Sequence, residues 1–401
     1  MFKFVHIADS HLDSPIVSNE KYREVIMEEA QRAFKAAITL CIDEKCNALL
    51  ICGDLFDDDH LSFKTELMLR DSFEKLKKNG IEVFYSLGNH DPKSSKLRKF
   101  KLGENVHVFD SEEPETIEAN DADGNVLGTV TGVGYPTKHV DYNLSNNFRN
   151  IGKDNTVPSV AMLHTSLDIG GEKVYAPCTY EDLAVLDYDY WALGHIHKTT
   201  VYGQEKPAIF PGCTCGRHFA ETGSKGGYLV TLQKDAPPKA EFVELAGITW
   251  YDVVADGFDE ATDAGDMFDI CAGKIMETVN ESKINFIRLT LVGQCPMYEK
   301  LSMDDIEDLE NSLTKHTSTG VALVNKLESV INPDDYINDK HLLSIALSMA
   351  KEIKENPELK AQVMEILEGE YKGLDGGSSD EYIESLFENV SSRLCDVMIK
   401  K

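Results

Sequence analysis

Short apolar segments alternate with longer amphipathic segments over roughly the first 235 residues. Runs of five to seven mostly apolar residues favour buried strands, and apolar positions repeating every three to four residues favour helices. The pattern predicts strands at 2–8, 48–52 and 81–86 and helices at 20–45 and 63–79. Such alternation is typical of a layered α/β architecture.

Helical segments thin out after residue 105, where short apolar runs are bounded by glycine, proline and charged residues. We expect a strand at 105–109, a hairpin over 115–133 that turns at Asp123-Gly124, and strands at 159–163, 188–193, 208–210, 228–232 and 241–245. These strands predict a second sheet packed on the first. The expected fold of residues 1–247 is a four-layer α/β/β/α sandwich.

The pattern of apolar and polar residues changes near Trp250. Strands at 249–254, 286–291 and 321–324 with helices at 267–281 and 304–314 predict a small α/β domain over residues 248–332. Residues 333–401 have a helical pattern throughout, with helices expected at 340–355, 357–371 and 380–399. The first of these helices carries a broad apolar stripe formed by Leu342, Leu343, Ile345, Ala346 and Met349. The stripe favours a partner surface, a second copy of the chain or the chain's own small domain.

The formal net charge of −29 changes how a nucleic-acid substrate could be bound. This charge argues against binding by blanket neutralisation of phosphates, although bound divalent cations would supply local positive charge. No apolar run approaches the roughly 20 residues that span a bilayer, and no signal-peptide pattern opens the chain. The expected location is the cytoplasm, with the nine scattered cysteines as reduced thiols.

Metal-competent side chains cluster at the carboxyl ends of five predicted strands, where open α/β sheets bind their ligands. The clusters are Asp9-Ser10-His11, Gly53-Asp54, Gly88-Asn89-His90-Asp91, His164, and Gly194-His195-Ile196-His197. A single histidine at a strand end is most often structural. Five clusters in this order are improbable by chance and point to a dinuclear metal centre.

The ordered set D-x-H, G-D, G-N-H-D, H and G-H-x-H resembles that of the calcineurin-like metallophosphoesterases over roughly residues 1–235. The resemblance implies that Asp9, His11 and His197 hold one metal ion and that Asn89, His164 and His195 hold a second, with Asp54 bridging them. The mixture of oxygen and imidazole ligands fits manganese, iron or zinc, and the resemblance favours manganese. Two such ions can bind a phosphate oxygen and generate the attacking hydroxide.

Two further residues of the third cluster are candidates for catalysis. In the resembled family the histidine after the asparagine ligand acts on the substrate, so we expect His90 to donate to a phosphate oxygen or to the leaving alkoxide. Asp91 would orient the His90 imidazole, or it would only cap the following turn.

The residues directly after the Gly53-Asp54 and Asn89-His90 motifs, 55–59 and 91–93, contain no arginine, which weighs against a protein phosphatase. The segments at 4–15 and 53–57, and Pro211-Gly212 followed by 216–221, resemble instead the SbcD-type DNA repair nucleases, especially their bacterial YhaO-like relatives. Many of those nucleases carry histidine where this chain has Asp57. The resemblance implies a DNA phosphodiesterase, an exo- or endonuclease, and Asp57 in place of that histidine weighs against processive exonuclease activity.

Several residues could contact a phosphate backbone. Arg217 and His218 are substrate candidates, and a basic run follows the His90 motif, formed by Lys93, Lys96, Arg98, Lys99 and Lys101. A structural loop and a solvated helix face explain these residues about as well.

The resembled nucleases imply roles for the other two parts of the chain. The small domain would cap the active site, and the C-terminal helices would bind an SMC-like ATPase. The chain itself contains no G-x-x-x-x-G-K-[ST] motif. The alternatives are a small-nucleotide phosphodiesterase or phosphatase and a scaffold with a purely structural metal site.

Overall fold

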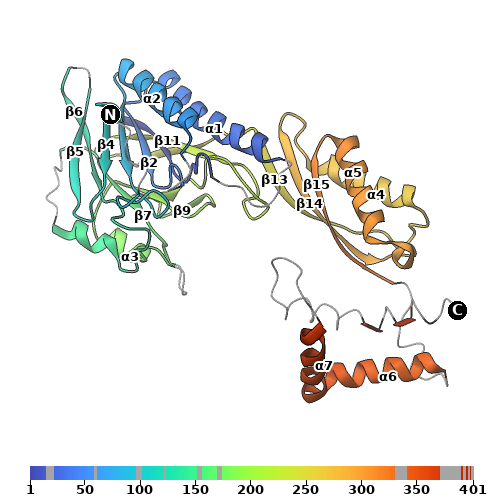
Figure 1. The fold of residues 1–401 in the computed structure, drawn as a ribbon. Helices are drawn as coiled ribbons and strands as arrows, with labels where there is room; N and C mark the ends of the chain where they lie inside the picture. The colour runs from blue at the N-terminus through green and yellow to red at the C-terminus, as the bar shows by residue number, and fades with distance from the viewer. Residues whose placement is uncertain are drawn as a thin grey trace. The chain divides into compact units, whose positions relative to one another are not determined.

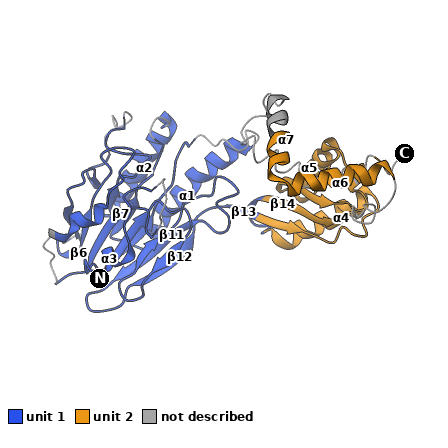
Figure 2. Ribbon diagram, turned by 90° about the horizontal axis from the view of Figure 1, so that it is seen from below, with its two compact units in different colours: residues 1–251, 280–286 blue, residues 252–279, 287–401 orange. Residues whose placement is uncertain are grey.

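The structure, a computed structural model, describes residues 1–14, 22–57, 61–95, 102–121, 123–150, 156–168, 174–329 and 341–370, with residues 390, 391, 394, 395 and 398. The chain forms two compact units (Figure 2). The first contains residues 1–251 and 280–286, and the second contains residues 252–279 and 287–401. The expected boundary at 332 lies outside the described residues, so the three-part division stays a prediction.

The first sheet of the first unit has six strands (Figure 1). Their order is β12 (Lys239–Glu244), β11 (Gly226–Leu232), β1 (Phe2–Ile7), β2 (Ala48–Cys52), β3 (Glu82–Ser86) and β4 (Val106–Phe109). Strands β1 to β4 are parallel, and β11 and β12 are antiparallel to their neighbours. The parallel strands β2 and β3 are buried on both faces, which explains their continuous apolar runs.

The second sheet also has six strands. Their order is β5 (Glu115–Asn120), β6 (Val126–Gly132), β7 (Ser159–His164), β8 (Tyr190–Gly194), β10 (Ala208–Phe210) and β9 (Thr200–Tyr202). The expected hairpin at 115–133 is present as β5 and β6. Strands β6, β7, β8 and β10 are parallel, so their carboxyl ends share one edge.

Three apolar clusters define the layers of this unit. The first packs α1 (Arg23–Asp43) and α2 (Phe63–Lys78) on the outer face of the first sheet. The second lies between the sheets and includes Phe4, Leu50, Val130 and Val160. The third packs η2 (Leu144–Asn150) and α3 (Tyr180–Ala184) on the outer face of the second sheet. The predicted four-layer sandwich is therefore confirmed.

The remaining elements lie in the second unit, except that the first two strands of its sheet begin in the first unit. Strands β13 (Ile248–Ala255), β14 (Ile284–Gln294) and β15 (Gly320–Glu328) form a sheet in that order, with helices α4 (Ala264–Thr278) and α5 (Met303–Thr317) and the short turn η3 (Tyr298–Lys300). Both helices begin with capping boxes, from Asp263 and Ser302. Helices α6 (Leu342–Glu355) and α7 (Pro357–Glu370) follow. The third expected tail helix, at 380–399, lies almost wholly outside the described residues.

Two further features concern the state of the cysteines and the character of the helices. All nine cysteines are buried free thiols, as expected for a chain without a disulfide framework. None of the helices in the described part of the chain has the length and apolar character needed to cross a membrane.

Candidate metal centre

Four of the candidate ligands have a backbone conformation that non-glycine residues rarely adopt. The φ angles of Asp9, His11, Asp54 and His195 are 50°, 42°, 51° and 102°. Main-chain bonds hold these turns, because Asp9 N–H donates to Gly53 O (3.1 Å) and His11 N–H donates to Asp54 O (2.9 Å). Such strain is retained where surrounding structure over-determines it, and it is concentrated at functional sites.

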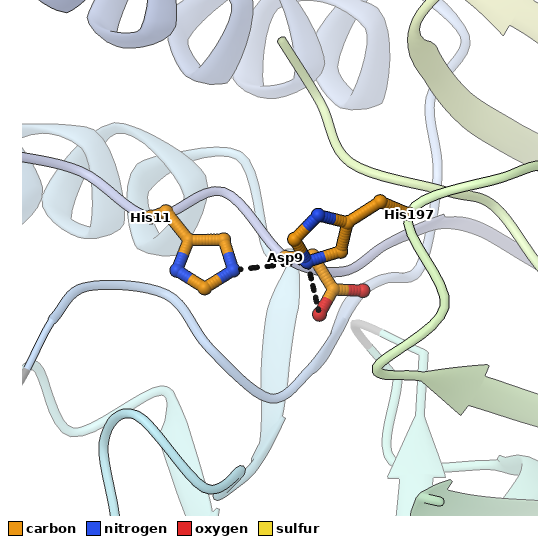
Figure 3. Close-up of side chains that lie close together, drawn as sticks. All are labelled: Asp9, His11 and His197. Atoms are coloured by element: carbon orange, nitrogen blue, oxygen red, sulfur yellow. Dashed lines mark hydrogen bonds and ion pairs between the residues drawn. The ribbon is translucent and has the colours of Figure 1, made fainter. Parts of the chain in front are cut away.

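One group of candidate ligands consists of Asp9, His11 and His197 (Figure 3). The Nε2 atoms of His11 and His197 lie 3.2 Å apart, and His197 Nε2 lies 3.7 Å from Asp9 Oδ1. Asp9 follows β1 and His197 follows β8, so the two sheets bring together residues that are almost 190 positions apart.

A second group surrounds His164, which ends β7. Its Nε2 atom lies 2.9 Å from Asn89 Oδ1 and 3.3 Å from Asp54 Oδ2. The same Asp54 oxygen is 3.9 Å from Nε2 of His11. Asp54 therefore lies between the two groups, in the position expected of a bridging ligand. His195 packs its ring on His164, with centroids 5.2 Å apart, and donates its backbone N–H to the Asp9 carboxylate.

Two glycines allow this crowding. A Cβ atom on Gly53 would lie 2.2 Å from His164 Nδ1, and one on Gly88 would lie 2.2 Å from Asp54 Oδ1. Gly53 also has a φ of +81°. Gly53 thus makes room for the side chain of His164, and Gly88 makes room for that of Asp54.

The hydrogen bonds donated by the imidazole Nδ1 atoms orient three of the histidines as metal ligands are oriented. His11 donates through Nδ1 to Asp57 (2.7 Å), His197 to Glu221 (2.5 Å) and His164 to the Cys52 carbonyl (3.0 Å). Each histidine therefore turns its Nε2 atom toward the other candidate ligands, the arrangement typical of metal-binding histidines. The Nε2 atoms of His11 and His197 lie 3.2 Å apart, close enough for both to bind one cation.

The electrostatic field in this region also favours positive charge. Burial opposes protonation of His164, but the Asp54 carboxylate outweighs it and raises the imidazole pKa to about 9. Burial raises the pKa of Asp9 to about 6, with a smaller contribution from the neighbouring Asp54 carboxylate. Both shifts fit a site built to hold cations.

The structure corrects the expected pairing of Asp91 with His90. Asp91 is fully buried and accepts hydrogen bonds from the backbone N–H groups of Gly88, Asp54 and Leu55 and from the Tyr85 hydroxyl. These four hydrogen bonds engage both carboxylate oxygens, and they link the loop after β2 to the loop after β3. The carboxylate beside His90 is instead Asp57, whose Oδ1 lies 3.0 Å from His90 Nδ1. This hydrogen bond raises the pKa of His90.

The substrate candidates are placed differently from one another. Arg217 is turned inward, donating to Ser14 Oγ (3.2 Å) and to Glu221 (3.2 Å). His218 is more exposed, and its Nε2 lies 3.4 Å from Glu221. In the basic run, Lys93 is exposed and pairs with Asp110 (3.1 Å), whereas Lys96, Arg98, Lys99 and Lys101 lie outside the described residues. Contact of any of these residues with a substrate stays a prediction.

The positions of Asp57 and Glu221 beside the candidate ligands do not follow from the sequence. In the sequence, Asp57 stands out only as a departure from histidine, and Glu221 only as part of a resembled segment. The signal available for both is a carboxylate in a segment next to a ligand motif. Their partners, His11 and His197, are 46 and 24 positions away in the chain, so only the fold pairs them.

Comparisons with known proteins agree with this geometry. Residues 2–199 match the family described as "Calcineurin-like phosphoesterase". "Uncharacterized metallophosphoesterase YhaO" of Bacillus subtilis is 33% identical over 300 residues, covering 73% of this chain and 72% of that protein. "DNA double-strand break repair protein Mre11" is 28% identical over 208 residues in Methanocaldococcus jannaschii and 26% identical over 270 residues in Methanopyrus kandleri. These matches cover 49% and 61% of this chain, and only 51% and 57% of the two Mre11 proteins.

Proposed function

The chain belongs to the calcineurin-like phosphoesterase family, a family of metal-dependent hydrolases, and from that premise we propose that it hydrolyses phosphodiester bonds of DNA. The observation that carries the proposal is the convergence of seven candidate ligands from both sheets, with a partly exposed histidine beside them. A scaffold whose metals serve structure alone would not need that histidine.

The residues fit two divalent ions. Asp9, His11 and His197 would hold the first, Asn89, His164 and His195 the second, and Asp54 would contact both. When bound, the ions would polarise the phosphate and activate a water nucleophile. We propose manganese as the metal, since imidazole and oxygen donors together suit it, with iron or zinc as the other candidates.

His90 is the proposed general acid. Its side chain is 48% exposed and its Nδ1 is engaged by Asp57, so Nε2 remains to face a substrate. Its backbone N–H donates to Asp54 Oδ1 (2.8 Å), which fixes the residue against the ligand shell. From this position His90 can donate a proton to the leaving oxygen or a hydrogen bond to a phosphate oxygen. Asp57 would hold the ring in that orientation.

DNA is the proposed substrate class because two relatives named for DNA double-strand break repair are 28% and 26% identical over 208 and 270 residues. The net charge of −29 is compatible with this only if positive charge is local, at the metal ions and in the basic run after His90. A role in DNA repair follows from the same relatives and is part of the proposal.

A test compares the purified chain with Asp54→Asn, using manganese and end-labelled single- and double-stranded DNA. Asp71→Asn, an exposed carboxylate on α2, is the matched control. We expect cleavage by the native chain and Asp71→Asn and none by Asp54→Asn. Bis-p-nitrophenyl phosphate is assayed in parallel, and cleavage of this small ester without cleavage of any DNA would reject the proposal.

One observation favours the alternative of a small phosphodiester or nucleotide substrate. Asp57 occupies the position where many related nucleases have histidine, and its carboxylate is committed to His11 and His90. Asp57 therefore offers no hydrogen-bond donor to the phosphates of a long DNA strand. Efficient hydrolysis of nucleoside phosphodiesters with no cleavage of DNA would support this alternative.

We also propose that α6 docks an SMC-like ATPase. The broad stripe expected on this helix is divided in the structure: Leu343 is buried and packs with Leu347 and Cys395, whereas Leu342, Ile345 and Met349 are 72%, 58% and 57% exposed. The second set, named the α6 outer stripe, is an apolar surface available to a partner. A second copy of the chain is the competing occupant.

A further inference from the structure

Glu221 lies in the loop after β10 and is 3% exposed. Its carboxylate accepts the Nδ1–H of His197 (2.5 Å), the backbone N–H of Arg217 (2.7 Å) and a hydrogen bond from Arg217 Nη2 (3.2 Å). A carboxylate held by several donors has little freedom to turn away from its imidazole. Glu221 therefore fixes both the tautomer and the orientation of His197.

The loop that carries Glu221 is itself anchored. Lys225 Nζ donates to the backbone carbonyl of His197 (3.1 Å), and the Phe219 ring packs edge-on against Trp250, with centroids 4.9 Å apart. The Glu221 N–H donates to His218 O (2.9 Å). His197 is thus supported at both its side chain and its main chain by one loop.

His11 has an equivalent support. Its Nδ1 donates to Asp57 Oδ1 (2.7 Å) from a ring that is almost completely buried. The two histidines of the first group are therefore both supported by ionised carboxylates, which strengthen Nε2 as an electron-pair donor. Asp9 adds a third carboxylate, directly among the candidate ligands.

The second group has weaker support. His164 donates its Nδ1–H to a neutral carbonyl, that of Cys52, and the group's own oxygen ligand is the neutral amide of Asn89. The carboxylates near His164 are Asp54 and Asp9, and both also lie at the first group. The first group alone adds the supporting carboxylates Asp57 and Glu221 to those that the two groups share.

We propose that the two ion positions are unequal: Asp57 and Glu221 are positioning residues that make the Asp9–His11–His197 position the tighter one, so it fills first and the Asn89–His164–His195 position exchanges readily. This inference rests on the two-ion centre of the proposed function, but not on the identity of the substrate. Loss of such a supporting carboxylate typically weakens metal affinity by about 10–100-fold.

The experiment titrates the full chain, stripped with a chelator, with Mn²⁺ alone. Free Mn²⁺ is counted by electron paramagnetic resonance, without any substrate. We expect two binding steps separated by about 10-fold or more. Glu221→Gln should weaken the tighter step by about 10–100-fold and leave the weaker step unchanged. Asn89→Ala should affect the weaker step alone, and the exposed Glu241→Gln on β12 should match the native chain.

Asp57→Asn is the second variant and covers the case in which Glu221→Gln does not fold. It should also weaken the tighter step. Two equal steps in the native chain, or unchanged binding in both carboxylate variants, would overturn the inference. Absence of DNA cleavage would reject the proposed function but would leave these binding steps intact, so the two failures are distinguishable.

Discussion

The Asp57 carboxylate accepts hydrogen bonds from the Nδ1 atoms of two histidines, 2.7 Å from that of the candidate ligand His11 and 3.0 Å from that of the candidate acid His90. One carboxylate thus couples the proposed metal position to the proposed catalytic side chain. The ring centroids of the two histidines are 4.8 Å apart, so a shift of Asp57 would disturb both.

Substitution of His90 should separate catalysis from metal binding. His90→Ala is expected to retain its metal ions and to lose about 10²–10⁴-fold in turnover, because its proton donation is lost while the ligand set is untouched. Turnover of bis-p-nitrophenyl phosphate and metal content by elemental analysis are measured together, with His316→Ala in the second unit as the control. Loss of metal with unchanged turnover per bound ion would contradict the assigned role.

Metal loading should stabilise the first unit. Cations bind the folded ligand set and not the unfolded chain, so saturation at 100 times Kd adds about 2.7 kcal/mol per site to the free energy of unfolding. We expect manganese to raise the thermal midpoint of the native chain, with two ions bound. Asp54→Asn should bind fewer ions and show a smaller rise. A stoichiometry of one or less in the native chain would refute the bridging assignment.

Asp91 should matter for stability before it matters for chemistry. Asp91→Ala leaves three backbone donors and the Tyr85 hydroxyl without their acceptor, a loss of roughly 3–5 kcal/mol in the free energy of unfolding. Tyr85→Phe removes one donor and should cost about 1–2 kcal/mol. Urea denaturation measures both. A catalytic defect in Asp91→Ala with native stability would instead restore the direct pairing with His90.

Gly53 and Gly80 form a matched pair for testing the crowding at the centre. Both have a positive φ, +81° and +69°, but a Cβ on Gly53 would meet His164 whereas nothing lies within 4 Å of one on Gly80. Gly80→Ala should cost only backbone strain, about 1–2 kcal/mol. Gly53→Ala should cause the same kind of backbone strain, and it should also displace His164 and lose one metal ion. Equal metal content in the two variants would show that the site relaxes around the methyl group.

The α6 outer stripe gives a test of the partner proposal. Replacing Leu342, Ile345 and Met349 together with glutamine should abolish co-purification with an SMC-like ATPase, because it removes apolar surface without disturbing the buried side of α6. Hydrolysis of small esters should be unchanged. Met303→Gln, at an 83% exposed residue on α5, is the control. Retained ATPase binding would reject the stripe as the docking surface, and loss of a homodimer would assign it to a second copy.

The sequence by itself determined the sandwich and the set of candidate ligands. Strands β2 and β10 begin and end where the apolar runs do, since each run is short and bounded by polar or turn residues. Because parallel strands place their carboxyl ends at one edge, the motif positions alone are enough to expect Asp9, Asp54 and Asn89 together. The short helix α3 does not follow from the sequence pattern, because five residues carry too little periodicity. Strand β9 does not follow either, because its three residues form no apolar run and are partly exposed, unlike those of β10.

Only the tertiary structure decided how the ligands are supported. Asp91 is adjacent to His90 in sequence, yet its carboxylate turns to the buried backbone of Gly88 and Leu55, while Asp57 reaches His90 from a different loop. Arg217 has the sequence context of a surface cation but folds inward to hold Glu221. Local periodicity determines which element a residue belongs to, whereas hydrogen-bond partners depend on which loops meet in space, and that is set by the packing of the two sheets.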